Sequence, residues 1–226
     1  MRLDDPVHVA SQYASEAPLE ARRSIYADAE GPDAREVAFA AIAEAAPERV
    51  LEVGGGPGEL SERIQRELGA EVVMLDISPR MVELARGRGV NARVGDVQDI
   101  PFADDEFDVA VAAWMLYHVP DLDRGLSELA RVAPRLVAVT NGQDHTLELR
   151  RLAGERAWQP RFRREEAGEL LERHFARVER RDTDGWVTVD PDGVRRYLES
   201  LGGGPAEGPD SPIRVRTACG IFVADR

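Results

Sequence analysis

The stretch RVLEVGGGPGEL, residues 49–60, decides how this chain folds. It begins with an apolar run, continues into a glycine cluster and is followed at once by an amphipathic pattern. This order predicts a buried strand, a tight turn and the start of a helix. At such a junction main-chain N–H groups face outward, and glycines allow a ligand to come close. The stretch therefore predicts the floor of a nucleotide-like cofactor site.

Strand and helix patterns alternate on both sides of the turn. Apolar runs predict strands at residues 50–53, 71–77, 91–95, 107–113, 135–140, 178–189 and 214–224. Helical periodicity predicts helices at residues 34–45, 59–68, 78–87, 121–133, 144–157, 164–174 and 190–201. The order predicts an α/β fold, a Rossmann-like doubly wound and mostly parallel seven-stranded sheet with helices on both faces.

The length suits one domain with added segments better than two full domains. We expect a single domain over residues 1–226, with a cofactor-binding core at 46–143 and a substrate-side half at 144–226. Residues 1–45 are expected to form an N-terminal helical lid. The loosely helical segment 7–30 reads equally well as a surface appendage.

The composition excludes several function classes. The formal charge is 29 − 42 = −13, which argues against a nucleic-acid partner, because phosphate backbones attract clustered cations. All 29 basic residues are arginine, so no lysine is present to form a Schiff base or a P-loop. Cys219 is the single cysteine, which excludes an internal disulfide. Since no signal-peptide pattern and no long apolar run is present, we expect a cytoplasmic protein without membrane contact, as a monomer or homodimer.

The glycine turn has a rival interpretation as a dinucleotide fingerprint. Gly54 and Gly56 fit that pattern, but its last glycine falls on Glu59. Glu52 and Glu59 would also face the phosphates of a dinucleotide. The turn therefore favours a cofactor that lacks phosphate and carries positive charge.

Two acids follow neighbouring strands at the edge where such sheets bind ligands. Asp76 ends the second strand and could accept hydrogen bonds from both hydroxyls of a ribose, or act only as a helix cap. Asp96 follows the third strand and could accept a hydrogen bond from an adenine amino group, with Ile77 and Val97 on the ring faces. An ordinary acidic loop is the alternative for Asp96.

A lone histidine, His118, follows the fourth strand in WMLYHVPD, residues 114–121. Its position at the carboxyl end of a strand is typical of a functional residue. A packed or hydrogen-bonded core histidine is the alternative interpretation.

Together these motifs resemble the class I S-adenosylmethionine-dependent methyltransferases, of the small-molecule type similar to the ubiquinone/menaquinone-biosynthesis methyltransferases. The resemblance covers about residues 49–141 and rests on LEVGGGPG at 51–58, Asp76, Gly95-Asp96 with IPF at 100–102, and Phe107-Asp108 leading to HVPD at 118–121. It implies S-adenosyl-L-methionine as the cofactor and methyl transfer to a small-molecule acceptor as the reaction.

The cofactor site predicted from the turn and the resemblance contains twelve residues, one of them a lid tyrosine taken from similar methyltransferases. They are Tyr13, Glu52, Gly54, Gly55, Gly56, Asp76, Ile77, Met81, Asp96, Val97, Ala113 and Trp114. The chain departs from the family pattern at residues 55–58, where members often carry Cys-Gly-Thr-Gly, and at Tyr117, where a second histidine is common.

Methyl transfer from a sulfonium is a direct displacement, so the protein must mainly align the reactants and exclude water. His118 is the first candidate for an acceptor-side base, with His145 and Tyr117 behind it. Asn141, Asp144 and His145 could instead form a metal site, but one carboxylate is too little, and no metal is expected. A nicotinamide-dependent oxidoreductase and a catalytically inactive cofactor-binding module are the alternative functions.

Overall fold

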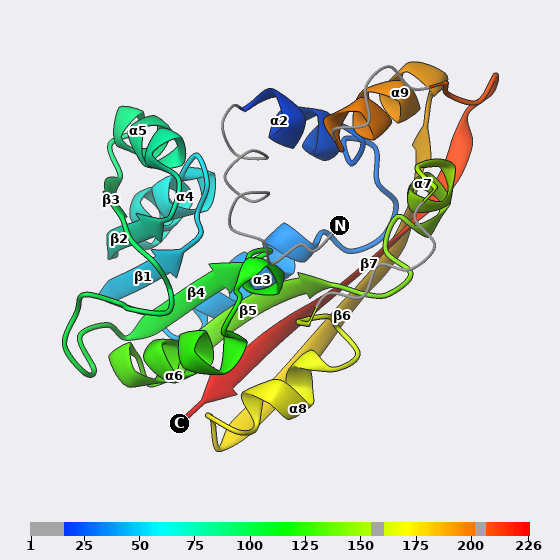
Figure 1. Cartoon of the computed structure of the whole chain (residues 1–226). Coiled ribbons are helices and arrows are strands. Elements are labelled where there is room, and N and C mark those ends of the chain that lie inside the picture. The colour runs from blue at the N-terminus through cyan, green and yellow to red at the C-terminus, as the bar shows by residue number, and fades with distance from the viewer. Residues whose placement is uncertain (1–15, 155–160, 202–206) are drawn as a thin grey trace.

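The computed structural model describes residues 16–154, 161–201 and 207–226 and contains one seven-stranded sheet (Figure 1). The strand order is β3-β2-β1-β4-β5-β7-β6. β1 to β5 run parallel, and β7 lies antiparallel between β5 and β6. The predicted Rossmann-like, mostly parallel sheet is confirmed. The strands are β1 Arg49–Val53, β2 Glu71–Asp76, β3 Asn91–Val94, β4 Val109–Ala113, β5 Arg135–Asn141, β6 Arg177–Val189 and β7 Ile213–Asp225.

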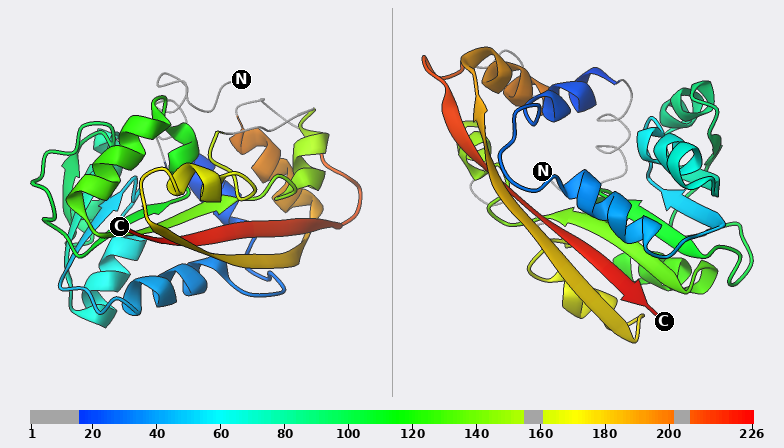
Figure 2. Two further views of the ribbon diagram at one scale, coloured as in Figure 1. Left: turned by 90° about the horizontal axis from the view of Figure 1, so that it is seen from below. Right: turned by 180° about the vertical axis from the view of Figure 1, so that it is seen from behind.

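Helices cover both faces of this sheet (Figure 2). The side chains of each parallel strand alternate between the faces: Leu51 joins a core with α6 and α8, and Val50 joins one with α3 and α4. The helices are α2 Ala17–Ser24, α3 Ala34–Ala43, α4 Glu59–Leu68, α5 Pro79–Gly87, α6 Leu122–Val132, α7 Leu147–Leu152, α8 Ala167–Leu171 and α9 Pro191–Ser200, with a 3-10 turn η1 at Leu116–His118.

Side-chain caps fix where several helices begin. The carboxylate of Asp33 accepts a hydrogen bond from the Arg35 N–H, and the hydroxyl of Ser78 accepts one from the Met81 N–H. Asp121 and Asp190 cap α6 and α9 in the same way. The predicted starts at Asp33 and Ser78-Pro79 are therefore confirmed.

A smaller core lies beyond the carboxyl ends of the parallel strands. It joins α7, α9 and the far half of the β6–β7 hairpin to Ile25, which follows α2 (Figure 1). Ile25, Leu149, Val194 and Val215 are its buried members from these four segments. The chain thus builds a second wall opposite α4 and α5, with the ends of β1 and β4 between them.

The helices of the second half are shorter than the periodicity predicts. The helix expected at 144–157 covers only Leu147–Leu152, and the one expected at 164–174 covers only Ala167–Leu171. Arg164 lies before the helix, where its N–H donates to the Asn141 carbonyl, 3.0 Å away. At the N-terminal end the helical segment is Ala17–Ser24, and Tyr13 lies outside the described residues. Among the described helices, none combines the length and the apolar character needed to cross a membrane.

Candidate functional site

The turn between β1 and α4 is held in a conformation that suits glycine. Gly54, Gly56 and Gly58 have φ angles of +67°, +59° and +82°, in the left-handed region. A Cβ atom on Gly54 would lie 2.7 Å from the side chain of Met115. A Cβ atom on Gly56 would meet nothing within 4 Å, so this residue faces open space. The turn therefore offers main chain to a ligand at Gly56.

Asp76 ties the end of β2 to this turn. One carboxylate oxygen accepts a hydrogen bond from the Gly56 N–H at 2.9 Å, and the other accepts one from the Ser78 N–H at 2.8 Å. Burial raises the pKa of Asp76, while the two backbone hydrogen bonds act in the opposite direction. Each carboxylate oxygen retains capacity for a further donor, so the side chain can still accept from ribose hydroxyls.

Glu52 lies beneath the turn and supports it from inside. Its side chain is 2% exposed and accepts a hydrogen bond from the Ser61 hydroxyl in α4. A Cβ atom on Gly55 would lie 2.9 Å from its carboxyl carbon. Burial raises the pKa of Glu52 to about 7, with a smaller contribution in the same direction from Asp76. Glu52 therefore presents almost no surface to a ligand in this conformation.

The residues predicted around the adenine divide into one exposed side chain, one half-buried carboxylate and two enclosed side chains. Ile77 is 54% exposed at the start of the loop after β2. Met81 is fully buried, and Val97 lies in the core close to Gly125. The carboxylate of Asp96 accepts hydrogen bonds from the backbone and side-chain N–H groups of Gln98. Ile77 is therefore the apolar surface that this part of the structure offers to a ring.

Trp114, next to Ala113 at the end of β4, adopts a strained but well-held conformation. Its φ angle is +54°, which costs about 1–3 kcal/mol for a residue other than glycine. Its N–H donates to the Val139 carbonyl at 2.9 Å, and its indole N–H donates to the Asn141 side-chain oxygen at 3.0 Å. The orientation of the half-buried indole is therefore set by β5.

Tyr117 and His118 follow in the short η1 turn. Their rings meet edge to face with centroids 4.5 Å apart, and both side chains are half-buried. The His118 N–H donates to the Met115 carbonyl at 2.9 Å, which closes the turn. The turn follows Trp114 closely, so the predicted base His118 and Trp114 of the predicted cofactor site lie in one short segment after β4.

His145 is engaged at both ring nitrogens. Nδ1 accepts a hydrogen bond from the Ala218 N–H at 3.0 Å, and Nε2 lies 2.8 Å from the Tyr26 hydroxyl. Because Nδ1 accepts, the neutral ring carries its proton on Nε2 and donates it to Tyr26. Burial lowers the pKa of His145 to about 3, and Arg150 acts in the same direction. In this conformation His145 is a hydrogen-bond donor and is not available as a base.

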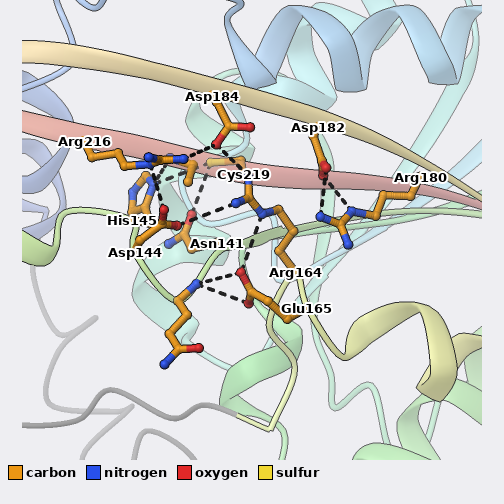
Figure 3. A network of polar contacts seen from close by, with 12 residues as sticks. Asn141, Asp144, His145, Arg164, Glu165, Arg180, Asp182, Asp184, Arg216 and Cys219 are labelled. Atoms are coloured by element: carbon orange, nitrogen blue, oxygen red, sulfur yellow. Dashed lines mark hydrogen bonds and ion pairs between the residues drawn. The ribbon is translucent and has the colours of Figure 1, made fainter.

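Cys219, His145 and Asn141 form a contiguous group that resembles a nucleophilic triad only in residue types. The Cys219 sulfur lies 3.4 Å from the Asn141 side-chain oxygen and 3.7 Å from His145 Nδ1 (Figure 3). Burial raises the pKa of the Cys219 thiol to about 12. A thiol with a raised pKa beside a histidine with a lowered pKa does not form a reactive thiolate.

In the alternative metal site, formed by Asn141, Asp144 and His145, the carboxylate of Asp144 makes ion pairs with arginine side chains. Asp144 pairs with Arg216 at 2.7 Å and with Arg164 at 3.6 Å, and Asp184 pairs with the same two guanidinium groups (Figure 3). Within the part of the chain that the structure describes, no group of three or more His, Cys, Asp or Glu residues could hold a metal ion. The cluster therefore braces the ends of β5, β6 and β7.

The fold brings together the glycine turn, Asp76, Ile77, Trp114 and η1 at the carboxyl edge of the sheet. The sequence interpretation did not identify Tyr26 or Met115 as site residues. Met115 could have been found, because it lies inside the motif around His118. Tyr26 is joined to His145 across 119 positions, and no local pattern signals that contact.

Residues 51–135 match a family model described as a methyltransferase domain. One curated relative is the ubiquinone/menaquinone biosynthesis C-methyltransferase UbiE of Idiomarina loihiensis. It is 36% identical over 94 residues, which cover 37% of this chain and 38% of that protein. The matches span only 26% to 44% of the length of the curated relatives.

Solved structures share the fold over most of the chain. A possible histamine N-methyltransferase of Thermotoga maritima, described as S-adenosylmethionine-dependent, has a TM-score of 0.56 and 21% identity, and the similarity covers 85% of this chain and 89% of that one. The [4+2]-cyclase SpnF has a TM-score of 0.62 and 19% identity, covering 96% and 95%. The fold is thus shared with proteins of different activity.

Proposed function

We propose that this chain, whose residues 51–135 match a methyltransferase-domain model, transfers a methyl group from S-adenosyl-L-methionine to a small-molecule acceptor. The observation that carries the proposal is the contact between the Asp76 carboxylate and the Gly56 N–H, 2.9 Å apart. It joins the strand-end acid to the glycine turn after β1, and the strand order reverses between β1 and β4, where such sheets bind ligands. The same residues lie inside the matched methyltransferase region.

The turn fits the cofactor on three counts. Gly56 faces open space, Asp76 retains acceptor capacity for a ribose, and Ile77 offers an exposed apolar side chain to an adenine. The net charge of −13 also suits a cation better than a dinucleotide. When bound, S-adenosylmethionine supplies a methyl group on a sulfonium, whose leaving group is neutral.

The chain's own residues have mainly positioning roles in this proposal. Trp114 and Tyr117 form part of the wall on the acceptor side, and α2 limits access of water. His118 is proposed as the base that takes a proton from the acceptor where the acceptor must lose one. Its half-buried position in η1 supports this role, and the engaged ring of His145 favours His118 over His145.

The acceptor is proposed to be a small organic molecule. The relative named above is a C-methyltransferase of quinone biosynthesis, which makes hydroquinones a reasonable first set to test. The acceptor side is formed by segments that lie largely outside the matched region, so the acceptor of a relative does not carry over.

Calorimetry with S-adenosylmethionine, S-adenosylhomocysteine and NAD tests the cofactor. We expect both adenosyl ligands to bind and NAD not to bind; tight NAD binding without the others would refute the proposal. A screen with labelled methyl groups against hydroquinones, phenols, amines and carboxylates then tests transfer. Binding of the adenosyl ligands without transfer to any acceptor class would favour an inactive module or a different reaction on the same fold.

A further inference from the structure

Helix α2 lies between α9 on one side and α4 and α5 on the other (Figure 1), and side chains connect it to both. On one side the Arg22 guanidinium donates to the Ser200 carbonyl at the end of α9. On the other side Arg23 pairs with Glu59, the first residue of α4, at 2.5 Å, and Glu16 lies 3.9 Å from Arg80 in α5. No residue of α2 is fully buried, but several are half-buried where the helix packs along α9. The helix is therefore held by this packing, by the polar contacts and by the chain that follows it.

Two residues after α2 attach it to the rest of the chain: Ile25 is buried in the smaller core, and Tyr26 makes a partly buried hydrogen bond. Tyr26 lies two residues beyond the helix, and its hydroxyl accepts from His145 Nε2 at 2.8 Å. His145 is itself fixed, because Ala218 donates to Nδ1 and the Arg150 side chain donates to the His145 carbonyl at 3.1 Å. Exposed ion pairs contribute little and are screened by salt, whereas a partly buried hydrogen bond between neutral groups is not screened in this way. The Tyr26–His145 hydrogen bond is therefore expected to stabilise the position of α2 more than the exposed ion pairs do.

The same histidine is also linked to Trp114, one of the predicted cofactor-site residues. His145 Nδ1 is 3.7 Å from the Cys219 sulfur, and Cys219 donates to the Asn141 oxygen that also accepts from the Trp114 indole. A row of polar contacts therefore runs from α2 through Tyr26 and His145 to Trp114.

We propose that His145 is a positioning residue which, through its hydrogen bond to Tyr26, holds α2 as a lid over the Gly54–Gly58 turn. The proposal rests on the proposed function in one respect, namely that the site beneath the lid binds S-adenosylmethionine. Burial also raises the pKa of Tyr26 and lowers the pKa of His145, so both groups stay neutral and the bond persists across the physiological pH range. In this proposal His145 controls access to the cofactor site by holding α2, and His118 is the proposed acceptor-side base.

Two histidine variants separate the two bonds of the ring. His145→Asn places an amide near Nδ1, so it can satisfy the Ala218 N–H but cannot reach Tyr26. His145→Gln places an amide donor near Nε2, so it can still donate to Tyr26. Tyr26→Phe removes the acceptor itself, and Tyr197→Phe is the matched control, since Tyr197 lies in the same small core and its hydroxyl bonds to Thr146.

Amide hydrogen exchange of residues 17–29, measured on the full chain without ligand, tests the proposal. Loss of one net hydrogen bond should speed exchange of this segment about three- to tenfold in Tyr26→Phe and His145→Asn. His145→Gln and Tyr197→Phe should stay near the wild-type rate. Unchanged exchange in Tyr26→Phe, or equal acceleration in Tyr197→Phe, would overturn the proposal. If the His145 variants do not fold, the comparison of the two tyrosine variants decides it.

Calorimetry with S-adenosylhomocysteine provides the second measurement. We expect Tyr26→Phe to weaken its binding about three- to tenfold, because part of the binding energy then has to order the lid, and Tyr197→Phe to leave it unchanged. If the wild-type chain does not bind this ligand, the proposed function fails, while the exchange result still decides whether His145 holds α2. Faster exchange with unchanged affinity would show that α2 is held but is not a lid, and would overturn that part of the proposal.

Discussion

The two walls of the site are built in different ways. The cofactor wall, formed by the Gly54–Gly58 turn, Asp76 and the start of α5, depends on main-chain geometry within short sequence motifs. The opposite wall, formed by α2, α7, α9 and the β6–β7 hairpin, depends on side-chain contacts between segments far apart in the chain. The first wall is therefore suited to a fixed ligand, and the second can change its lining without changing the fold.

The largest effect is expected at His118, which lies between the walls. Removal of a general base typically costs about 10²–10⁴-fold in rate, so His118→Ala should lower kcat by at least about 100-fold while the affinity for S-adenosylhomocysteine stays unchanged. Labelled-methyl kinetics and calorimetry measure the two quantities. His174→Ala, on the α6–α8 side and paired with Asp123, is the control and should retain activity. Full activity of His118→Ala would remove the base from the proposed mechanism.

The second effect tests the cofactor wall alone. Asp76→Ala removes the acceptor of the Gly56 and Ser78 N–H groups and of the expected ribose hydroxyls. Since each hydrogen bond to a charged group contributes about 1.5–3 kcal/mol, cofactor affinity should fall by about 100-fold or more. Calorimetry with S-adenosylhomocysteine measures this, and Asp99→Ala is the control, because the Asp99 side chain is 90% exposed. Equal affinity of both variants would place the ribose elsewhere.

The same difference between the walls explains what the sequence could predict. The turn, the alternation of strands and helices and the helix starts near residues 34 and 78 follow from local patterns, since each involves a few adjacent residues. The family resemblance was confirmed for the same reason, because the matched region is the cofactor half. The contacts of Tyr26 and the short helices α7 and α8 depend on distant partners, and periodicity carries no information about those.

The role of each residue within a recognised motif is also harder to predict than the presence of the motif. Glu52, Met81 and Val97 occupy positions that the family pattern indicates, yet their side chains are enclosed. Alternation along a strand or helix decides whether a side chain meets the ligand or supports the wall from behind. In the case of Glu52, this placement beneath the turn has a measurable consequence for stability.

The pH dependence of the free energy of unfolding should reveal the titration of Glu52, the buried carboxyl group of the cofactor wall. The pKa of Glu52 rises from 4.5 to about 7 on folding, so the folded state binds the extra proton. This contribution is fully present below the unfolded pKa and is lost as pH rises through the folded value, a change of up to about 3 kcal/mol. Glu52→Gln should remove this loss between those two pH values, as measured by urea unfolding. Glu83→Gln, whose side chain is 72% exposed, should behave like the wild type.

The smallest effect concerns the wall built by distant contacts, at the place where the chain after α2 meets β6. Glu30 and Trp186 exchange two backbone hydrogen bonds, of 2.7 and 3.1 Å, and a Cβ atom on Gly185 would lie 2.1 Å from the Glu30 carbonyl oxygen. Gly185→Ala should therefore break this pairing and lower the free energy of unfolding by about 1–2 kcal/mol, the net contribution of two hydrogen bonds. Gly168→Ala in α8 is the control, since its Cβ would meet only Phe222 at 3.9 Å and alanine favours a helix. Urea unfolding measures both variants. A Gly185→Ala protein as stable as the wild type would mean that the pairing contributes nothing, and that the segment after α2 is held by its side chains alone.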